Sequence, residues 1–235
     1  MQTFYLSKKN GRYFLIYLLA VTVLIVAAKN ALPQATAVTA EPYRQGNITD
    51  NKVSLAINVD WGEEYIPDML AVLSEYDVKA TFFLTGRWTT NNPDMAAAIA
   101  AAGHEIGNHA YSHSSPNENT YQQNIEEITK TEDAIVKAAG ITTRLYAPPS
   151  GESEEHVLQA ADDCGYKVIL WSVDTIDWQK PDAATIVSRV ASKIHGGAII
   201  LAHPTASTLA ALPDIIEKAQ EQGYVFTTVS ENIGL

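Results

Sequence analysis

Histidine and carboxylate residues of this sequence stand just after short apolar stretches, in an arrangement that could do chemistry. His109 and His113 are four residues apart, so in a helix or a tight loop both imidazoles lie on one face and can share a metal ion. Asp60 follows an earlier apolar stretch, and its carboxylate could complete a His-His-carboxylate set with an open coordination position. His203 ends a buried-type stretch before a proline and is a candidate proton donor. The structural alternatives are two exposed loop histidines, a helix-capping aspartate and a core histidine.

Further polar segments follow other apolar stretches, at 147–151 and 172–178. In the second segment, Asp174 and Asp177 could orient His203 or cap a helix. A chain that needed only stability would have no reason to gather such residues at one end of its strands. Their placement is the strongest indication of a functional site that the residues themselves give.

The elements that must position these residues alternate along the chain. Apolar stretches predict strands at 53–57, 80–84, 105–107, 144–146, 167–171, 198–201 and 225–229. Helical spacing of apolar residues predicts helices at 66–76, 94–102, 122–139, 154–163, 183–194 and 209–222. This alternation predicts a parallel sheet with crossover helices, either an open doubly wound sheet or a small barrel. In both architectures the working face lies at the carboxyl ends of the strands.

Composition limits the class of protein. The 235 residues suit one domain with a short appendage, and 46% hydrophobic with 18% charged residues indicates a globular body. The formal net charge of −11 argues against a nucleic-acid partner, because phosphate neutralisation needs a basic face. Cys164 is the only cysteine, so an internal disulfide is impossible, and we interpret it as a small buried apolar residue.

The first thirty residues resemble an export segment. Lys8, Lys9 and Arg12 precede an apolar run at 13–28, which is slightly long for a signal-peptide core and slightly short for a spanning helix. We expect residues 1–30 to be a signal peptide or an N-terminal membrane anchor, residues 31–51 to be a linker and residues 52–235 to be the domain. Both forms of the segment place the domain outside the cytoplasm, because the positive charges stay inside.

Four segments carry a family resemblance. Residues 103–109 read GHEIGNH, 79–83 read KATFF, 171–181 read WSVDTIDWQKP and 200–208 read ILAHPTAST. In type and order these segments resemble the motifs of the NodB-homology polysaccharide deacetylases, carbohydrate esterase family four, and in particular its sporulation subgroup. The resemblance covers about residues 52–230, which is effectively the whole domain.

The resemblance implies a distorted (β/α) barrel and metal-assisted hydrolysis of N-acetyl groups on a cell-wall glycan, peptidoglycan or a related N-acetylglucosamine polymer. It implies a divalent metal, with zinc as the first candidate, held by His109, His113 and Asp60. It assigns Asp60 as the catalytic base and His203 as the general acid. It also implies that Ser150 offers a backbone N–H to the oxyanion. The complete set of implied substrate-binding residues is Trp61, Pro148, Ser150, Asp177, Trp178 and Leu201.

The sequence also departs from the family pattern. The adjacent aspartates of the first motif become a single carboxylate, Asp60, between Val59 and Trp61. If Asp60 fills the base position, Trp61 stands at the metal aspartate. If instead Asn58 is at the base position, Asp60 or Val59 falls near the metal. The arginine of the third motif is replaced by Ala147.

Two functions therefore remain open from the sequence. The first is a working deacetylase with an unusual metal shell, and the second is a binding or structural module that kept the groove and lost catalysis. The His pair and His203 favour the first function, and the missing carboxylate and arginine favour the second. A nucleotide-binding domain is disfavoured, because no glycine-rich phosphate loop follows the first strand.

Overall fold

The structure is a computed structural model that describes residues 17–19, 21–22 and 41–235. The chain divides into two units, 1–38 and 39–235. Most of the expected export segment, and residues 31–40 of the expected linker, lie outside the described residues. No helix among the residues that are described is long and apolar enough to cross a membrane.

A single curled sheet forms the centre of the second unit. Its strands pair in parallel in the order β5-β4-β3-β2-β1-β7-β6, and β8 pairs with the beginning of β1. The bounds are β1 Lys52–Val59, β2 Thr81–Leu84, β3 Glu105–Asn108, β4 Leu145–Tyr146, β5 Lys167–Val168, β6 Val173–Asp174, β7 Ile199–Ala202 and β8 Val225–Phe226. The predicted parallel α/β architecture is confirmed, and the sheet curls as a partial barrel.

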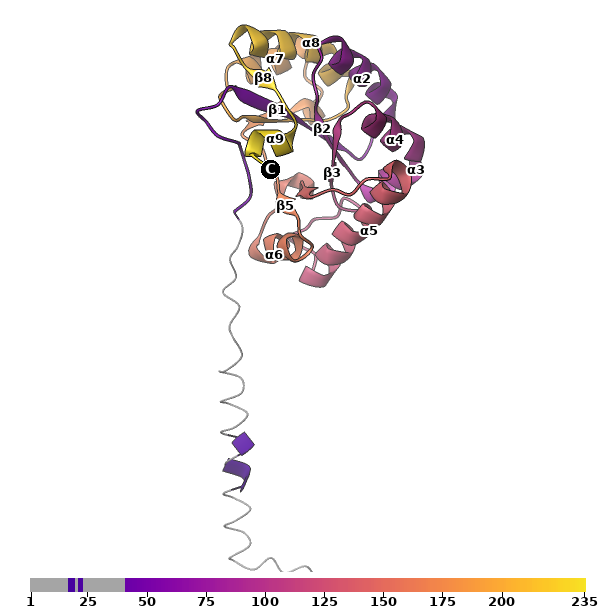
Figure 1. Cartoon of the computed structure of the whole chain (residues 1–235), viewed down its shortest axis with the longest axis vertical. Helices are drawn as coiled ribbons and strands as arrows, with labels where there is room; N and C mark the ends of the chain where they lie inside the picture. Colours follow the sequence, from indigo (N-terminus) through magenta and orange to yellow (C-terminus); the bar gives the residue numbers. More distant parts are fainter. Residues whose placement is uncertain (1–16, 20, 23–40) are drawn as a thin grey trace, which may run out of the picture. The chain divides into compact units, whose positions relative to one another are not determined.

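Helices surround the sheet (Figure 1). Their bounds are α2 Ile66–Glu75, α3 Gly86–Asn91, α4 Pro93–Ala101, α5 Tyr121–Ala139, α6 Glu155–Asp163, α7 Ala183–Ala191, α8 Ala206–Glu221 and α9 Val229–Ile233. Short 3-10 turns occupy Glu63–Tyr65, Pro149–Gly151 and Asp177–Gln179. The longest helix, α5, begins at a capping box formed by Thr120 and Gln123 and ends at Gly140, whose φ of 71° is left-handed.

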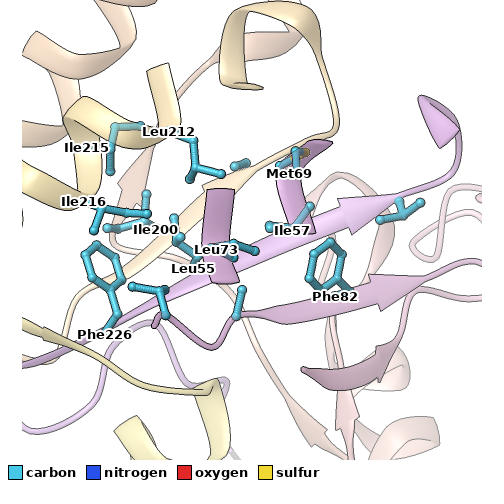
Figure 2. Packing of buried hydrophobic residues seen from close by; sticks show 14 of the residues in the cluster. Leu55, Ile57, Met69, Leu73, Phe82, Ile200, Leu212, Ile215, Ile216 and Phe226 are labelled. Carbon is cyan, nitrogen blue, oxygen red and sulfur yellow. The ribbon is translucent and has the colours of Figure 1, made fainter. Parts of the chain in front are cut away.

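The main core fills the space between β1 and the helices. Leu55 and Ile57 of β1 pack with Leu73 of α2 and with residues of β7 and α8, as Figure 2 shows. Because side chains alternate across a strand, the odd-numbered residues of β1 face this core and the even-numbered residues face the inside of the curled sheet. This alternation decides which side chain β1 can offer to a site inside the curl.

Several segments differ from the sequence-based expectations, among them the following three. The predicted strand at 225–229 ends at Phe226, because Thr228 and Glu231 form a capping box that starts α9. Helix α3 was not predicted, since its six residues show no apolar period. Tyr43 and Gln45, expected in the linker, form bridges to Ile169 and Ala198. This segment therefore lies along the domain, between the residue that follows β5 and the residue that precedes β7.

Candidate functional site

A pocket of about 360 Å³ opens among the carboxyl ends of the strands. Six different strands or their following loops contribute to it, as expected for the working face of a parallel sheet. The lining residues are Asn58, His109, His113, Ser150, Trp171, Asp174, Trp178, Leu201 and His203. The pocket thus gathers both histidines of the predicted pair and the predicted proton donor.

His203 is held by a buried aspartate. Its Nδ1 lies 2.7 Å from Oδ1 of Asp177, and its backbone N–H donates to Oδ2 at 2.6 Å. Thr208 Oγ1 donates to the same Oδ2 at 2.5 Å. Burial alone would raise the pKa of Asp177, but the hydrogen bonds from His203 and Thr208 outweigh it and hold that pKa below its usual value. An ionised Asp177 fixes the ring proton of His203 on Nδ1 and leaves Nε2 free for proton transfer.

The imidazoles of His109 and His113 meet edge to face, with ring centroids 5.0 Å apart. His109 is buried, and its Nδ1 lies 2.6 Å from the carbonyl oxygen of Ala147, so Nδ1 carries the proton and Nε2 is an acceptor. Burial and the neighbouring His113 lower the pKa of His109 to about 3. This ring is therefore neutral at physiological pH.

The loop between the two histidines is held by groups that sequence reasoning missed. Ala110 and His113 adopt left-handed backbone, with φ of 62° and 57°. Asn108 Oδ1 accepts from the Ala110 N–H at 3.0 Å. Glu127 of α5 accepts from the backbone N–H groups of Tyr111 and Ser112 at 2.9 and 2.7 Å. No local sequence pattern identifies Glu127 as part of the site, because its hydrogen-bond partners belong to a loop that precedes α5 in the chain.

The structure decides which residue of β1 enters the pocket. Asn58 lines it, whereas Val59 belongs to the core on the other face of the strand. Asp60 does not contribute to this lining. Its Oδ1 accepts from Thr85 Oγ1 at 2.8 Å, and Arg87 contacts both of its oxygens at 2.8–2.9 Å. The strand ends before Asp60, so the pleat no longer directs its side chain inward.

The remaining expected residues divide into two groups. Ser150, Trp178 and Leu201 line the pocket. The other expected contacts lie outside the lining: Asp177 lies behind His203, Trp61 stacks on the His203 ring and Pro148 packs beside the Ser150 turn. Trp171 and Asp174 line the pocket but were not among the expected substrate contacts.

The donor set of this pocket differs from that of a protein zinc site. Protein zinc sites use three or four ligands drawn from His, Cys and carboxylates. Among the residues that the structure describes, no group of three or more such side chains is arranged to hold a metal. Asn58 lines the same pocket as the His pair and offers a carboxamide, whose buried Oδ1 has no hydrogen-bond partner within the described part of the chain. The residues present therefore do not fit a complete zinc centre.

Known proteins share both this sequence and this fold. A family profile described as polysaccharide deacetylase matches residues 46–169. The uncharacterized protein YlxY of Bacillus subtilis (strain 168) is 43% identical over 191 residues, which are 81% of this chain and 60% of that protein. A peptidoglycan-N-acetylglucosamine deacetylase of Bacillus cereus is 36% identical over 189 residues, which are 76% of this chain and 68% of that enzyme.

A solved structure with a similar fold is BA3943 of Bacillus anthracis, described as a CE4 family pseudoenzyme. It is 42% identical and gives a TM-score of 0.81, with 83% of this chain and 69% of that one covered. A mutant of BA3943 is described as having restored enzymatic activity. This chain spans only part of the length of these relatives, about three fifths in the case of YlxY.

Proposed function

Because this chain belongs to the polysaccharide deacetylase family, we propose that its pocket receives an N-acetyl group of a cell-wall glycan and that His203 and Asp177 serve hydrolysis of that group. The relatives that support this substrate class are named deacetylases of peptidoglycan N-acetylglucosamine or N-acetylmuramic acid. The observation that carries the proposal is the His203–Asp177 pair, whose histidine lines the same pocket as His109 and His113.

The chemistry follows from the protonation states of these residues. Hydrolysis adds water across the acetamide C–N bond, releases acetate and leaves an amine on the sugar. Nε2 of His203, unprotonated while Nδ1 carries the ring proton, can take a proton from the attacking water and then give it to the departing nitrogen. Asp177 keeps the ring in the tautomer and orientation that this transfer requires. We further propose that the backbone N–H of Ser150, in the pocket wall, stabilises the oxyanion.

Deacetylases of this family depend on a metal. A bound ion would polarise the acetamide carbonyl and activate the attacking water. His109 and His113 are side chains of this pocket that could contact such an ion, and Asn58 of the same lining offers a neutral carboxamide rather than a carboxylate. We propose that any zinc binding here is weaker than with a full triad.

Acetate release from an N-acetylglucosamine oligomer and from peptidoglycan tests this function. We expect release by the wild-type protein and a loss of about 10²–10⁴-fold in His203→Gln, which removes the proton donor. Lys130→Gln is the matched control, because it removes an exposed helix ion pair with Glu126. Equal release by wild type and His203→Gln would overturn the assignment of His203.

Glycan binding without hydrolysis is the second candidate, and the observation that favours it is Asn58. A carboxamide cannot take a proton from water at neutral pH, so the pocket lacks a carboxylate base at the end of β1. The buried carbonyl oxygen of Asn58 also lacks a donor among the described residues. Turning the carboxamide by a half-turn would exchange its oxygen and nitrogen, and the oxygen could then accept from the acetamide N–H of a bound sugar.

Calorimetry with the same oligomer separates the two candidates. Binding of the oligomer, with no acetate formed over hours, would establish the second candidate. Acetate formation that depends on His203 would establish the first. Absence of both binding and release would exclude this glycan for either function.

We also propose that the domain acts outside the cytoplasm, as its cell-wall relatives do. Residues 1–30 would then serve as a signal peptide or a membrane anchor, on the basis of Lys8, Lys9 and Arg12 before the apolar run. N-terminal sequencing of the protein recovered from the membrane and the medium would distinguish the two forms. A role in sporulation rests on the subgroup resemblance alone, and the spore yield of a deletion strain would test it.

A further inference from the structure

The chain segment that leaves β1 is tied to the ends of three other strands. At Asp60 it is bound by Arg87, 2.8 Å from Oδ2 and 2.9 Å from Oδ1, and by Thr85 at 2.8 Å. Thr85 and Arg87 follow β2. Two donors from Thr85 and Arg87 therefore occupy a carboxylate whose side chain is only 16% exposed. Charge-assisted bonds of this kind are the strong ones, so they fix where the chain turns after β1.

Trp61, the next residue, stacks on the imidazole ring of His203. The Trp61 indole and the His203 imidazole are nearly parallel, with an interplanar angle of 9° and ring centroids 6.0 Å apart. Gly62 follows with a φ of 83°, and a Cβ there would stand 2.1 Å from the carbonyl oxygen of Pro204. The chain after β1 and the chain after β7 are thus in backbone contact. This contact fixes the backbone next to Trp61, which is itself 45% exposed.

Arg87 also reaches the histidine loop. Its backbone N–H donates to the carbonyl oxygen of Tyr111 at 2.9 Å, between His109 and His113 in the chain. One residue therefore joins the strand end that carries Trp61 to the strand end that carries the histidine pair. Such a position is suited to holding two sides of a pocket at a fixed separation.

From these contacts we infer that Asp60 is a positioning residue, which, through its ion pair with Arg87, holds Trp61 against the ring face of His203. Asp177 fixes the same ring at Nδ1, so the imidazole is constrained at two places. This role differs from the base or metal ligand that the sequence suggested for Asp60. Its meaning for catalysis rests on the proposed function, but the contact between Trp61 and His203 does not.

NMR of the His203 ring protons tests the inference without any substrate. An indole stacked on an imidazole shifts those signals upfield, and Trp61→Leu should abolish the shift. If the ion pair holds Trp61, Asp60→Asn and Arg87→Gln should each lose part of the shift, and Arg87→Lys, which keeps the charge, should lose less. His203→Gln assigns the signals. Lys130→Gln, which breaks the exposed pair with Glu126, should leave them in place.

A different NMR result would contradict the inference. If Trp61→Leu moves the His203 signals while Asp60→Asn and Arg87→Gln leave them unchanged, the ion pair does not position Trp61. Arg87 is half exposed, so its variants are expected to fold, and their backbone spectra verify this. Failure of the proposed function would show as absent acetate release with the NMR result intact.

Where acetate release is measurable, a second comparison separates positioning from base catalysis. A positioning role predicts that Asp60→Asn and Arg87→Gln reduce kcat by similar factors, with no further loss in the double variant, because both remove one interaction. A base role predicts that Asp60→Asn alone loses about 10²–10⁴-fold while Arg87→Gln retains most activity. The second result would overturn the inference.

Discussion

Replacing Asp177 by asparagine changes one atom of a fully buried side chain and should move a proton on His203. Oδ2 accepts from the His203 backbone N–H and from Thr208, and Oδ1 accepts from His203 Nδ1. Asparagine offers one carbonyl oxygen and one NH₂ group. If the NH₂ replaced Oδ2, it would face a backbone N–H that cannot rotate away. The carbonyl therefore takes the Oδ2 position and the NH₂ faces Nδ1. Nδ1 must then accept, so the ring proton moves to Nε2.

The cost can be bounded from the same contacts. A hydrogen bond to a charged acceptor contributes about 1 kcal/mol more than a neutral one, so three bonds set an upper limit of about 3 kcal/mol on the loss of unfolding free energy. Relief of charge burial subtracts from this loss. Because hydrogen bonds lower the pKa of Asp177, its stabilisation is present above the unfolded value of 3.8 and is lost as pH falls below it. The difference between wild type and variant should therefore shrink in acid.

Three measurements check this prediction. Nitrogen-15 NMR of His203 reports which ring nitrogen carries the proton, denaturant unfolding reports stability, and acetate release should fall by about 10²–10⁴-fold if the proposed hydrolysis occurs. Thr208→Val is the matched control, because it removes one donor to Asp177 without placing a donor against Nδ1. An Asp177→Asn protein whose His203 still carries its proton on Nδ1 would refute the reasoning.

Other parts of the molecule give sharper tests of packing, charge and metal binding. Burial, and to a lesser extent Lys79, lower the pKa of His104 from 6.5 to about 4. The neutral His104 ring therefore contributes fully to the free energy of unfolding above pH 6.5. Between pH 6.5 and about pH 4 this contribution falls by about 1.4 kcal/mol for each pH unit of acidification. His104→Gln should flatten the unfolding free energy between those pH values, and an unchanged slope would contradict the assignment. Asn58→Asp should add a carboxylate to the pocket that contains the His pair and tighten zinc binding in calorimetry. We expect at least about a tenfold gain, since the loss of an outer-shell partner already lowers metal affinity by about that factor. Equal zinc affinity in the two proteins would place Asn58 out of reach of the ion. Gly86→Ala should destabilise the fold by about 1–3 kcal/mol in denaturant unfolding, because its Cβ would lie 2.3 Å from the Tyr111 ring, whereas without that clash alanine would stabilise.

Much of the fold was visible in local patterns. Apolar stretches separated by helical periods predicted a parallel sheet with crossover helices, and this prediction is confirmed because the period of a segment reports which of its faces is buried. The short β6 and the small helices α3 and α9 were missed, since capping and tertiary contacts rather than periodicity create them. Element ends in general depend on such contacts.

The candidate site divides in a similar way. Residues at the carboxyl ends of parallel strands must share one edge of the sheet, so the sequence alone placed His109, His113 and His203 together. It could not choose between Asn58 and Asp60, because the direction of the chain beyond β1 depends on an arginine 27 residues further along. Interactions between residues distant in sequence leave no periodic trace, so only the tertiary structure could show that Asn58 enters the pocket while Asp60 pairs with Arg87.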